Sequence, residues 1–345
     1  MNFHLDFTPK PFTTKISHYQ KLLLIGSCFT ENIGTKLKHH KFEVLENPNG
    51  ILFNPISITK SVTSYIDNKK YTDKDLFYQN ECWNSWEHHS RFSHPDAAQC
   101  LKEINQSQQQ AHTFLKNADW LMITLGSAFA YTLNFAESKT EKSKAGLDEA
   151  VVANCHKVPT DKFNKKLLTL EEITVALQLM LDKLVVLNPS VKIIFTISPV
   201  RHLRDGFVEN NRSKARLIEA VHSLVGTKEN LFYFPAYELV IDDLRDYRFY
   251  AEDMVHPNYA ATNYVWDKFV ATCIDEPAQK LMKEINTINA AKSHKPFNST
   301  SQQHKKFLQL NLERVSELSK QHLYINFEEE KKYFSRSDRN TDVTD

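Results

Sequence analysis

The chain has little glycine, only seven residues among 345. It contains neither the G-x-G-x-x-G turn of dinucleotide-binding folds nor the G-x-x-x-x-G-K-[ST] loop of P-loop proteins, so neither phosphate cradle is indicated. It also lacks an excess of either charge, with 43 Lys and Arg against 42 Asp and Glu, which argues against a nucleic-acid partner. We therefore expect no cofactor and no nucleic acid.

Cysteine patterns and long apolar runs are absent as well. The cysteines are odd in number and far apart, and none forms C-x-x-C or a zinc-ribbon spacing, so we expect reduced thiols and no metal site. They are Cys28, Cys82, Cys100, Cys155 and Cys273. The N-terminus lacks the basic start and apolar run of a secretory signal, and no stretch approaches the ~20 apolar residues of a membrane span. These absences predict a cytoplasmic protein without membrane contact.

What the sequence does contain suits a soluble globular protein, with 41% hydrophobic and 25% charged residues. Short β-rich apolar runs alternate with segments of helical periodicity, which is typical of a parallel sheet covered by helices. The expected strands are 22–25, 42–45, 120–125, 192–197 and 231–234. The expected helices are 30–39, 96–117, 168–187, 211–224 and 258–273. The pattern predicts a doubly wound α/β fold, whose reactive groups lie at the carboxyl ends of the strands.

Two stretches interrupt this alternation and divide the chain. Residues 60–95 are rich in aromatics and histidine, and residues 134–166 are rich in charge. Insertions at strand ends usually shape a substrate pocket. After Ile274 the composition becomes polar, so we expect a main domain over 1–275, an extension of about two polar helices over 276–334 and a disordered tail over 335–345.

Gly26-Ser27-Cys28-Phe29 joins an apolar strand to a helix. Such a turn holds a side chain in the crevice, and the free N–H groups of the helix N-terminus stabilise an anion that develops there. Ser27 is therefore a candidate nucleophile, although it could instead merely cap the helix. Cys28 competes with it, but adjacent side chains point apart at a strand end, so we expect Cys28 to pack as a structural residue.

Asp253-Met254-Val255-His256-Pro257 precedes the last helix of the sheet. A carboxylate three residues before an imidazole can orient it, and a neutral serine needs such a base to take its proton. The alternative is an exposed Asp/His pair at the start of a helix. The Asp253–His256 pair indicates catalysis only if it acts together with Ser27.

With both motifs in place, the chain resembles the GSCFA domain proteins, a bacterial branch of the SGNH (GDSL-like) hydrolases. Gly26-Ser27-Cys28-Phe29 resembles the signature of that family, and Asp253-x-x-His256-Pro257 resembles the last block of the superfamily. Intervening stretches are similar too: 154–159, 198–202, 209–215, 234–238 and 244–250. The resemblance extends from about residue 21 to about residue 270.

The resemblance implies a three-layer α/β/α sandwich of flavodoxin-like topology with a mainly parallel five-stranded sheet, and an ester-cleaving serine enzyme. Superfamily members usually take oxyanion donors from the nucleophile's N–H, from a Gly after the second strand and from an Asn after the third. Gly50 matches the second donor. The third block begins Gly126-Ser127 and has no Asn, so Gly126 and Ser127 are candidates for oxyanion or substrate contact there, while the identity of the third donor stays open.

Three further residues are expected to contact substrate. Asn154 and His156 fall in the second insertion and could replace the missing Asn, or could simply form a loop turn. Arg201 follows the fourth strand and could bind an acidic group of the substrate, or could pair with Asp205.

An aromatic and basic cluster in the first insertion allows several interpretations. Its members are Trp83, Trp86, His88, His89 and Arg91. The cluster could stack on a sugar ring, or could pack the insertion against the sheet. Metal binding by Glu87, His88 and His89 is disfavoured, because adjacent histidines point apart.

The sequence therefore favours a serine esterase acting on a small O-acyl ester, with an acetylated carbohydrate as one candidate substrate. Ser27 would attack the acyl carbonyl, His256 would act as base, and Asp253 would orient it. An O-acyltransferase using the same acyl-enzyme and a binding protein without turnover are the alternatives. The sequence leaves the oligomeric state open.

Overall fold

The computed structural model describes residues 5–134 and 151–335. Its centre is a five-stranded parallel sheet with the order β10-β9-β5-β1-β2. The strands are β1 (Lys21–Gly26), β2 (Glu43–Glu46), β5 (Trp120–Leu125), β9 (Lys192–Ile197) and β10 (Leu231–Tyr233). In chain order this is 2-1-3-4-5, the flavodoxin-like order, and the strand order reverses between β1 and β5.

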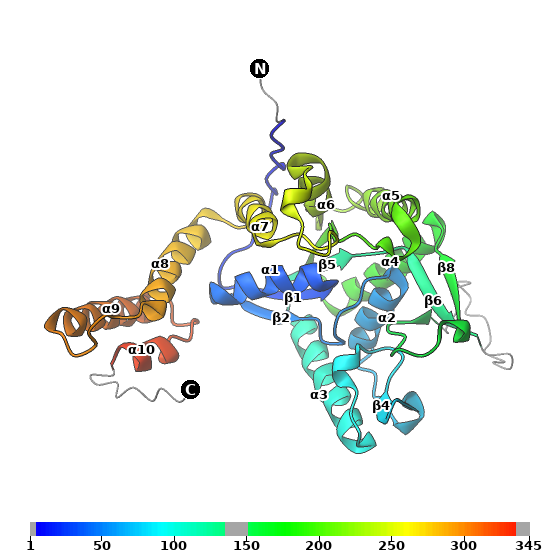
Figure 1. Cartoon of the computed structure of the whole chain (residues 1–345), viewed down its shortest axis with the longest axis horizontal. Coiled ribbons are helices and arrows are strands. Elements are labelled where there is room, and N and C mark those ends of the chain that lie inside the picture. Colours follow the sequence, from blue (N-terminus) through cyan, green and yellow to red (C-terminus); the bar gives the residue numbers. More distant parts are fainter. Residues whose placement is uncertain (1–4, 135–150, 336–345) are drawn as a thin grey trace.

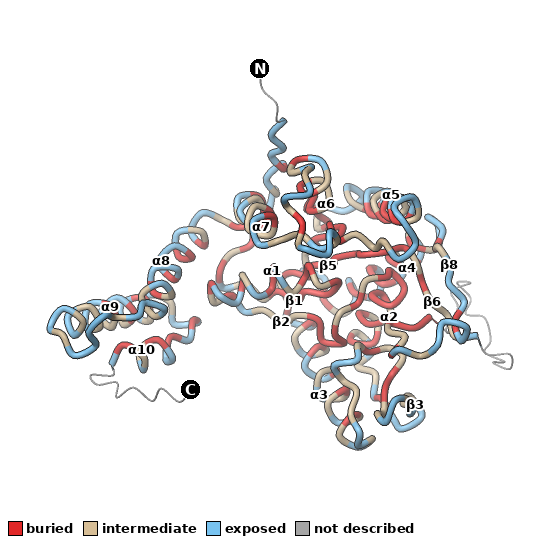
Figure 2. The backbone as a smooth tube through the Cα atoms, in the orientation of Figure 1, coloured by how far each residue is buried: buried red, intermediate tan, exposed pale blue. Residues whose placement is uncertain are grey.

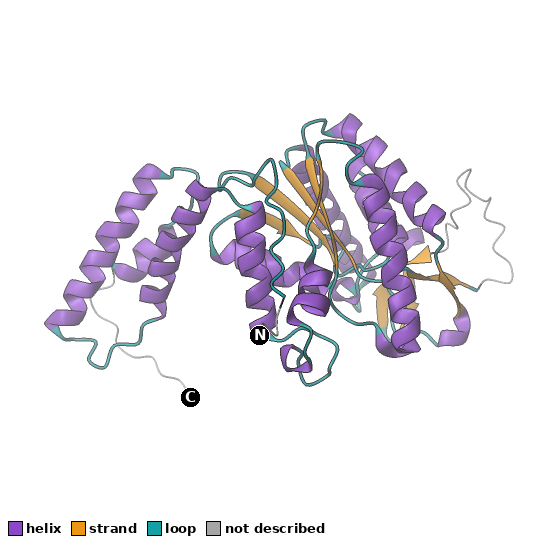
Figure 3. Ribbon diagram, turned by 90° about the horizontal axis from the view of Figure 1, so that it is seen from above, coloured by secondary structure: helices purple, strands orange, loops and turns teal. Residues whose placement is uncertain are grey.

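Helices cover both faces of the sheet (Figures 1 and 3). Successive strand residues point to opposite faces, so Leu23 and Ile25 join one apolar cluster while Leu22 and Leu24 join another. The first cluster contains residues of α2, α3, α4 and α5, and the second contains residues of α1, α7 and α8. The helix bounds are α1 (Cys28–His39), α2 (Pro55–Ile66), α3 (Ala97–Lys116), α4 (Leu170–Leu187), α5 (Gly206–Leu224), α6 (Ala236–Glu238), α7 (Tyr259–Cys273) and α8 (Glu276–Ser293). Figure 2 shows the buried backbone concentrated between these layers.

The expected strands and helices of the main domain are confirmed, with ends that differ by a few residues. One helix, α2, is not among the expected helices; it begins before the first insertion and extends into it. Its signals are local: the Asn54 side chain accepts from the Ser57 N–H at 2.8 Å, and Pro55 occupies the first helical position.

The two insertions form small antiparallel sheets. The first contains a hairpin of β3 (Phe77–Gln79) and β4 (Cys82–Asn84). The second contributes β7 (Val151–Val152) and β8 (Phe163–Leu167), which pair with β6 (Phe129–Leu133) in a sheet with the order β7-β6-β8. Residues 135–150, the first half of the expected charged insertion, lie outside the described residues.

The C-terminal extension lies to one side of the α/β body (Figure 1). It contains α8, α9 (Gln302–Gln321) and α10 (Glu328–Phe334), one helix more than the two expected. These helices share their own apolar cluster, which includes Ile285, Val315 and Phe327. The expected tail lies outside the described residues from residue 336 onward. Within the described residues, no helix is both long and apolar enough to cross a membrane.

Candidate active site

Ser27 lies where β1 meets α1, beside the point at which the strand order reverses. Gly26 has a φ of +151°, and a Cβ there would lie 2.4 Å from the Thr124 carbonyl oxygen, so the turn requires glycine. Ser27 is 3% exposed, its side chain does not cap α1, and its Oγ has no hydrogen-bond partner among the described residues. Because buried hydroxyls are usually hydrogen-bonded, this one is a candidate for contact with a substrate.

Asp253 and His256 form a hydrogen-bonded pair in the loop before α7. Asp253 Oδ2 lies 2.6 Å from His256 Nδ1, and Oδ1 accepts the N–H groups of His256 and Val255 at 3.0 and 2.9 Å. The His256 N–H, its ring and the Val255 N–H lower the pKa of the Asp253 carboxyl to about 2. An ionised carboxylate only accepts, so Nδ1 carries the proton and Nε2 is the basic nitrogen.

This loop contacts the carboxyl end of β9. The Arg201 N–H donates to the Val255 carbonyl at 3.2 Å, which holds the loop beside the residues that follow the strand. The Asp253–His256 pair is half-exposed, whereas Ser27 is buried. The described residues contain no hydrogen bond between Ser27 and His256.

The backbone donors suggested by the sequence are already engaged. The Gly50 N–H donates to the Asn47 carbonyl at 2.7 Å. The N–H groups of Gly126 and Ser127 both donate to the Phe53 carbonyl, at 2.8 and 3.0 Å. The Ser127 side chain accepts from the Phe129 N–H and lies 3.3 Å from Ser213 Oγ, so it organises the turn after β5. None of these three N–H groups is free to bind an oxyanion in this structure.

Lys214 lies at the carboxyl ends of β5 and β9 and is not among the residues expected from the sequence. Its Nζ donates to the carbonyls of Gly126 and Ser198, at 2.6 Å each. Burial lowers the pKa of Lys214 to about 7. The available signal was its position on the buried stripe of α5, between Ser213 and Leu217, where a lysine is unusual unless it is paired.

Asn47 is a second residue of this region that was not expected from the sequence. Its Oδ1 accepts the Gly26 N–H at 2.8 Å, and its Nδ2 donates to Glu31 at 3.3 Å. It therefore ties the loop after β2 to the turn that carries Ser27. The available signal was its place in the Asn-Pro-Asn-Gly stretch, where only Gly50 matched a superfamily position.

Arg201 does not pair with Asp205, contrary to the alternative raised from the sequence. Asp205 forms an ion pair with Lys165. The Arg201 guanidinium instead packs over the rings of Tyr250 and Tyr247, at 4.2 and 5.2 Å, and its buried Nη1 has no partner among the described residues. Arg201 thus has hydrogen-bonding capacity left for an oxygen of a ligand.

Asn154 and His156 organise the second insertion. Asn154 Oδ1 accepts the His156 N–H at 2.8 Å, and His156 Nε2 lies 2.9 Å from the Ser85 carbonyl oxygen. The His156 ring packs edge-on against Phe77 and Trp86. Neither residue is hydrogen-bonded to Ser27 or His256 in the described part of the chain, and their expected substrate role stays a prediction.

The aromatic cluster of the first insertion is largely committed to packing. Trp86 stacks on Phe77 with ring centroids 3.6 Å apart, and His88 is 1% exposed. Burial lowers the pKa of His88 to about 3. One face of the Trp86 ring is therefore covered and cannot stack on a sugar.

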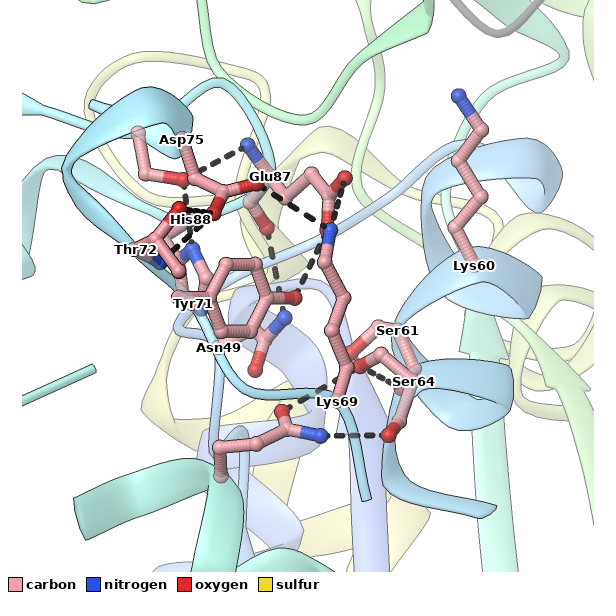
Figure 4. A network of polar contacts seen from close by, with 12 residues as sticks. Asn49, Lys60, Ser61, Ser64, Lys69, Tyr71, Thr72, Asp75, Glu87 and His88 are labelled. Atoms are coloured by element: carbon pink, nitrogen blue, oxygen red, sulfur yellow. Dashed lines mark hydrogen bonds and ion pairs between the residues drawn. The ribbon is translucent and has the colours of Figure 1, made fainter. Parts of the chain in front are cut away.

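Glu87 is held in a polar network between the first insertion and the C-terminal end of α2 (Figure 4). Its carboxylate accepts from Lys69 at 2.9 and 3.0 Å and from the Tyr71 hydroxyl at 2.8 Å. Burial raises the pKa of Glu87. The charge of Lys69 and the hydrogen bonds from Lys69 and Tyr71 have the larger effect, so the pKa of Glu87 is lowered. Among the residues the structure describes, no three His, Cys, Asp or Glu side chains gather to hold a metal ion.

The fold and these residues define a flavodoxin-like α/β/α protein with a serine at the end of its first strand and an Asp–His pair before the last helix of the sheet. The chain belongs to the GSCFA family, whose model matches residues 21–269. The model described as the C-terminal domain of GSCFA domain proteins matches residues 285–340.

Solved structures of two esterases resemble part of the chain. One is a carbohydrate esterase family 3 protein from Talaromyces cellulolyticus, at 10% identity and a TM-score of 0.36. The other is a mutant of an acetyl esterase with acetate ion, at 10% identity and a TM-score of 0.34. Each likeness covers 78% of this chain and 99% of the other, and these values are too low to bear on the activity of this chain. A search of curated proteins gave no match.

Proposed function

We propose that the chain is a serine esterase that cleaves a small O-acyl ester, with an O-acetylated carbohydrate as the candidate substrate class. The observation that carries the proposal is the Asp253–His256 hydrogen bond of 2.6 Å, which fixes the tautomer with a basic Nε2. The position of this pair supports it further, because the loop is bonded to the end of β9 while Ser27 ends β1 of the same sheet.

In the proposed first step, His256 Nε2 takes the proton of Ser27 as Oγ attacks the acyl carbonyl. The ionised Asp253 stabilises the imidazolium that forms. The carbonyl oxygen becomes an oxyanion near the Ser27 N–H and the N-terminus of α1, whose dipole favours negative charge. The Gly50 N–H already donates to the Asn47 carbonyl, so it stabilises the oxyanion only if it donates to both oxygens at once.

The proposed second step releases the acyl group. His256 returns its proton to the leaving alcohol, which breaks the ester C–O bond and leaves acyl-Ser27. A water molecule then attacks the acyl carbon while His256 takes its proton. Collapse of this intermediate releases the carboxylic acid and returns the proton to Ser27. A sugar hydroxyl in place of water would make the product an ester and the enzyme an O-acyltransferase.

Covalent labelling tests the nucleophile and the class together. We expect a serine-reactive fluorophosphonate to add one equivalent to the parent, seen by intact mass spectrometry, with peptide mapping to Ser27. Ser27→Ala should lose both the label and turnover of p-nitrophenyl acetate.

Cys28→Ala is the matched control, because burial raises the pKa of the Cys28 thiol and disfavours the thiolate. It should keep labelling and turnover near the parent's values. A labelled Ser27→Ala together with an inactive Cys28→Ala would make Cys28 the nucleophile. A parent that neither labels nor turns over any ester would favour a binding protein on this fold.

A further inference from the structure

His202 directs an unsatisfied ring nitrogen toward the carboxyl end of β5. Its Nε2 is buried and has no hydrogen-bond partner among the described residues. A Cβ built on Gly126 would lie 3.3 Å from this nitrogen and 2.8 Å from Phe53 Cβ. Gly126 follows β5 directly, so His202, which follows β9, reaches across to the end of the neighbouring strand.

Two contacts hold the histidine in this position. Its backbone N–H donates to Oδ1 of Asn210 in α5 at 2.9 Å, which fixes the His202 backbone against this helix. Its ring packs against the Phe53 ring with centroids 5.5 Å apart. A ring that packs against Phe53 on a fixed backbone, while one nitrogen lacks a partner among the described residues, is preorganised to bind a further group.

The same edge of the sheet carries Ser27. Gly26 pairs with Thr124 in the β1–β5 ladder, so Ser27 and Gly126 follow directly neighbouring strand ends. Ser27 Oγ is also buried without a partner among the described residues. An acyl carbonyl bound to Ser27 would therefore place its oxygen in a region where the N–H groups of Gly126 and Ser127 are already bonded to Phe53.

The charge state of His202 suits a hydrogen-bond donor. Burial, together with the nearby charges of Lys214 and His256, lowers the pKa of His202 to about 4. The imidazole is therefore neutral at pH 7 and carries a single N–H. A neutral imidazole can donate a hydrogen bond to an oxygen that gains negative charge without giving up its proton.

We propose that His202, in its Nε2–H tautomer, donates a hydrogen bond to the oxyanion, at the place where the sequence of this chain lacks an Asn after the third strand of the sheet. The inference rests on the proposed role of Ser27. It makes His202 a catalytic residue that contacts the acyl oxygen, whereas His256 remains the base.

The test compares His202→Phe, which keeps a ring but removes the donor, with His202→Gln, whose side-chain amide restores an N–H near the position of Nε2. With p-nitrophenyl acetate, His202→Phe should lower kcat about 10²- to 10³-fold, with KM within about threefold of the parent's. The kcat of His202→Gln should be about tenfold or more above that of His202→Phe. A residue that only supports the fold, or one that acts as the base, would not be rescued by glutamine.

His18→Phe is the control for substituting a buried, ring-packed histidine. Its ring packs against Phe42 with centroids 4.4 Å apart and also has a nitrogen, Nδ1, without a partner among the described residues. It should leave kcat unchanged. Thermal unfolding of each variant identifies those that fold like the parent.

The outcomes separate the two proposals. If the fluorophosphonate labels Ser27 in the parent while His202→Phe keeps the parent's kcat, or while His202→Gln is as inactive as His202→Phe, the role of His202 is overturned and that of Ser27 stands. If His202→Phe does not fold, His202→Gln decides. A folded His202→Gln with parent-like activity supports the role of His202, and a folded but fully inactive His202→Gln overturns it. If the parent is neither labelled nor active, both proposals fail.

Discussion

Lys214 shows how one side chain can join two strands through its ammonium group. The carbonyls of Gly126 and Ser198 follow the ends of β5 and β9, and Lys214 Nζ donates to both of them. Burial disfavours the charged form, which is why the pKa falls to about 7, although the two carbonyls favour the ammonium. Lys214 therefore contributes to stability in a way that depends on pH.

We predict that the stability difference between the parent and Lys214→Met changes with pH. Between about pH 7 and the ordinary lysine pKa near ~10.4, the unfolded chain holds a proton that the folded chain has released, so the contribution of Lys214 to the free energy of unfolding rises with pH. The slope is at most about 1.4 kcal/mol per pH unit. Urea unfolding of both proteins at pH 7, 8.5 and 10 measures it, and subtraction removes the other titrating groups. A difference that is constant with pH would contradict the prediction.

Asp253 is tested by a substitution that keeps its shape. Asp253→Asn removes the charge that stabilises the imidazolium, and its amide can donate to Nδ1 and impose the wrong tautomer. The same change in a serine protease triad lowers the rate by ~10⁴, but here a backbone hydrogen bond from the Ala251 N–H to the His256 carbonyl also holds the loop, so we expect a loss in kcat/KM of roughly 10- to 1,000-fold. His256→Ala should lose more. Parent-like kcat/KM in Asp253→Asn would assign the orienting role to another group.

The helix α7 supports the loop that carries Asp253 and His256. Asn258 precedes the helix, and its Oδ1 accepts the Ala261 N–H at 3.1 Å. Its Nδ2 donates back to the carbonyls of Arg248 and Tyr250, at 2.7 and 3.3 Å. One side chain therefore both begins the helix and closes the loop.

Asn258→Ala should reduce stability and catalysis together. Loss of the cap and of two loop hydrogen bonds should lower the free energy of unfolding by about 1–2 kcal/mol, and the loosened loop should lower kcat/KM. Ser301→Ala is the control, because Ser301 caps α9 through the His304 N–H, far along the chain from the site. It should reduce stability only. An Asn258→Ala variant with the parent's kcat/KM would show that other contacts hold the loop.

Polar contacts around one lysine help to attach the C-terminal helices to the α/β body, together with the apolar residues of α8 that pack in its core. Lys41, at the start of the connection into β2, forms an ion pair of 2.9 Å with the buried Glu330 of α10 and donates to the Asn326 carbonyl at 2.9 Å. Its Nζ also lies over the Phe327 ring. Breaking a buried ion pair leaves an uncompensated charge, which is costly.

Lys41→Met should therefore loosen the extension without affecting the chemistry. We expect amide hydrogen exchange in residues 276–335 to accelerate about tenfold or more, while kcat/KM for the ester stays at the parent's value. Lys41→Met combined with Glu330→Gln should restore part of the protection, since no buried charge then lacks its partner. Unchanged exchange in the single variant would mean that Lys292, which lies 4.0 Å from Glu330, compensates fully.

The sequence determined the layered α/β fold and the local geometry of both motifs. Strands such as β9 are apolar on both faces, and the spacing of Asp253 and His256 is short enough for a loop to bring them together. These features depend on near neighbours in the chain, which is why periodicity and spacing reveal them. The family resemblance was confirmed by the match over residues 21–269.

Only the tertiary structure decided which polar groups remain free. Whether Gly50 or Gly126 can donate depends on carbonyls that the folded loops supply, and Asp205 pairs with Lys165 rather than with its near neighbour Arg201. The His202 nitrogen that lacks a partner among the described residues likewise lies beside Phe53 and Gly126, which are distant in the chain. Hydrogen bonding of buried groups is a property of the whole packed arrangement, because each donor is satisfied by whichever acceptor the fold brings within reach.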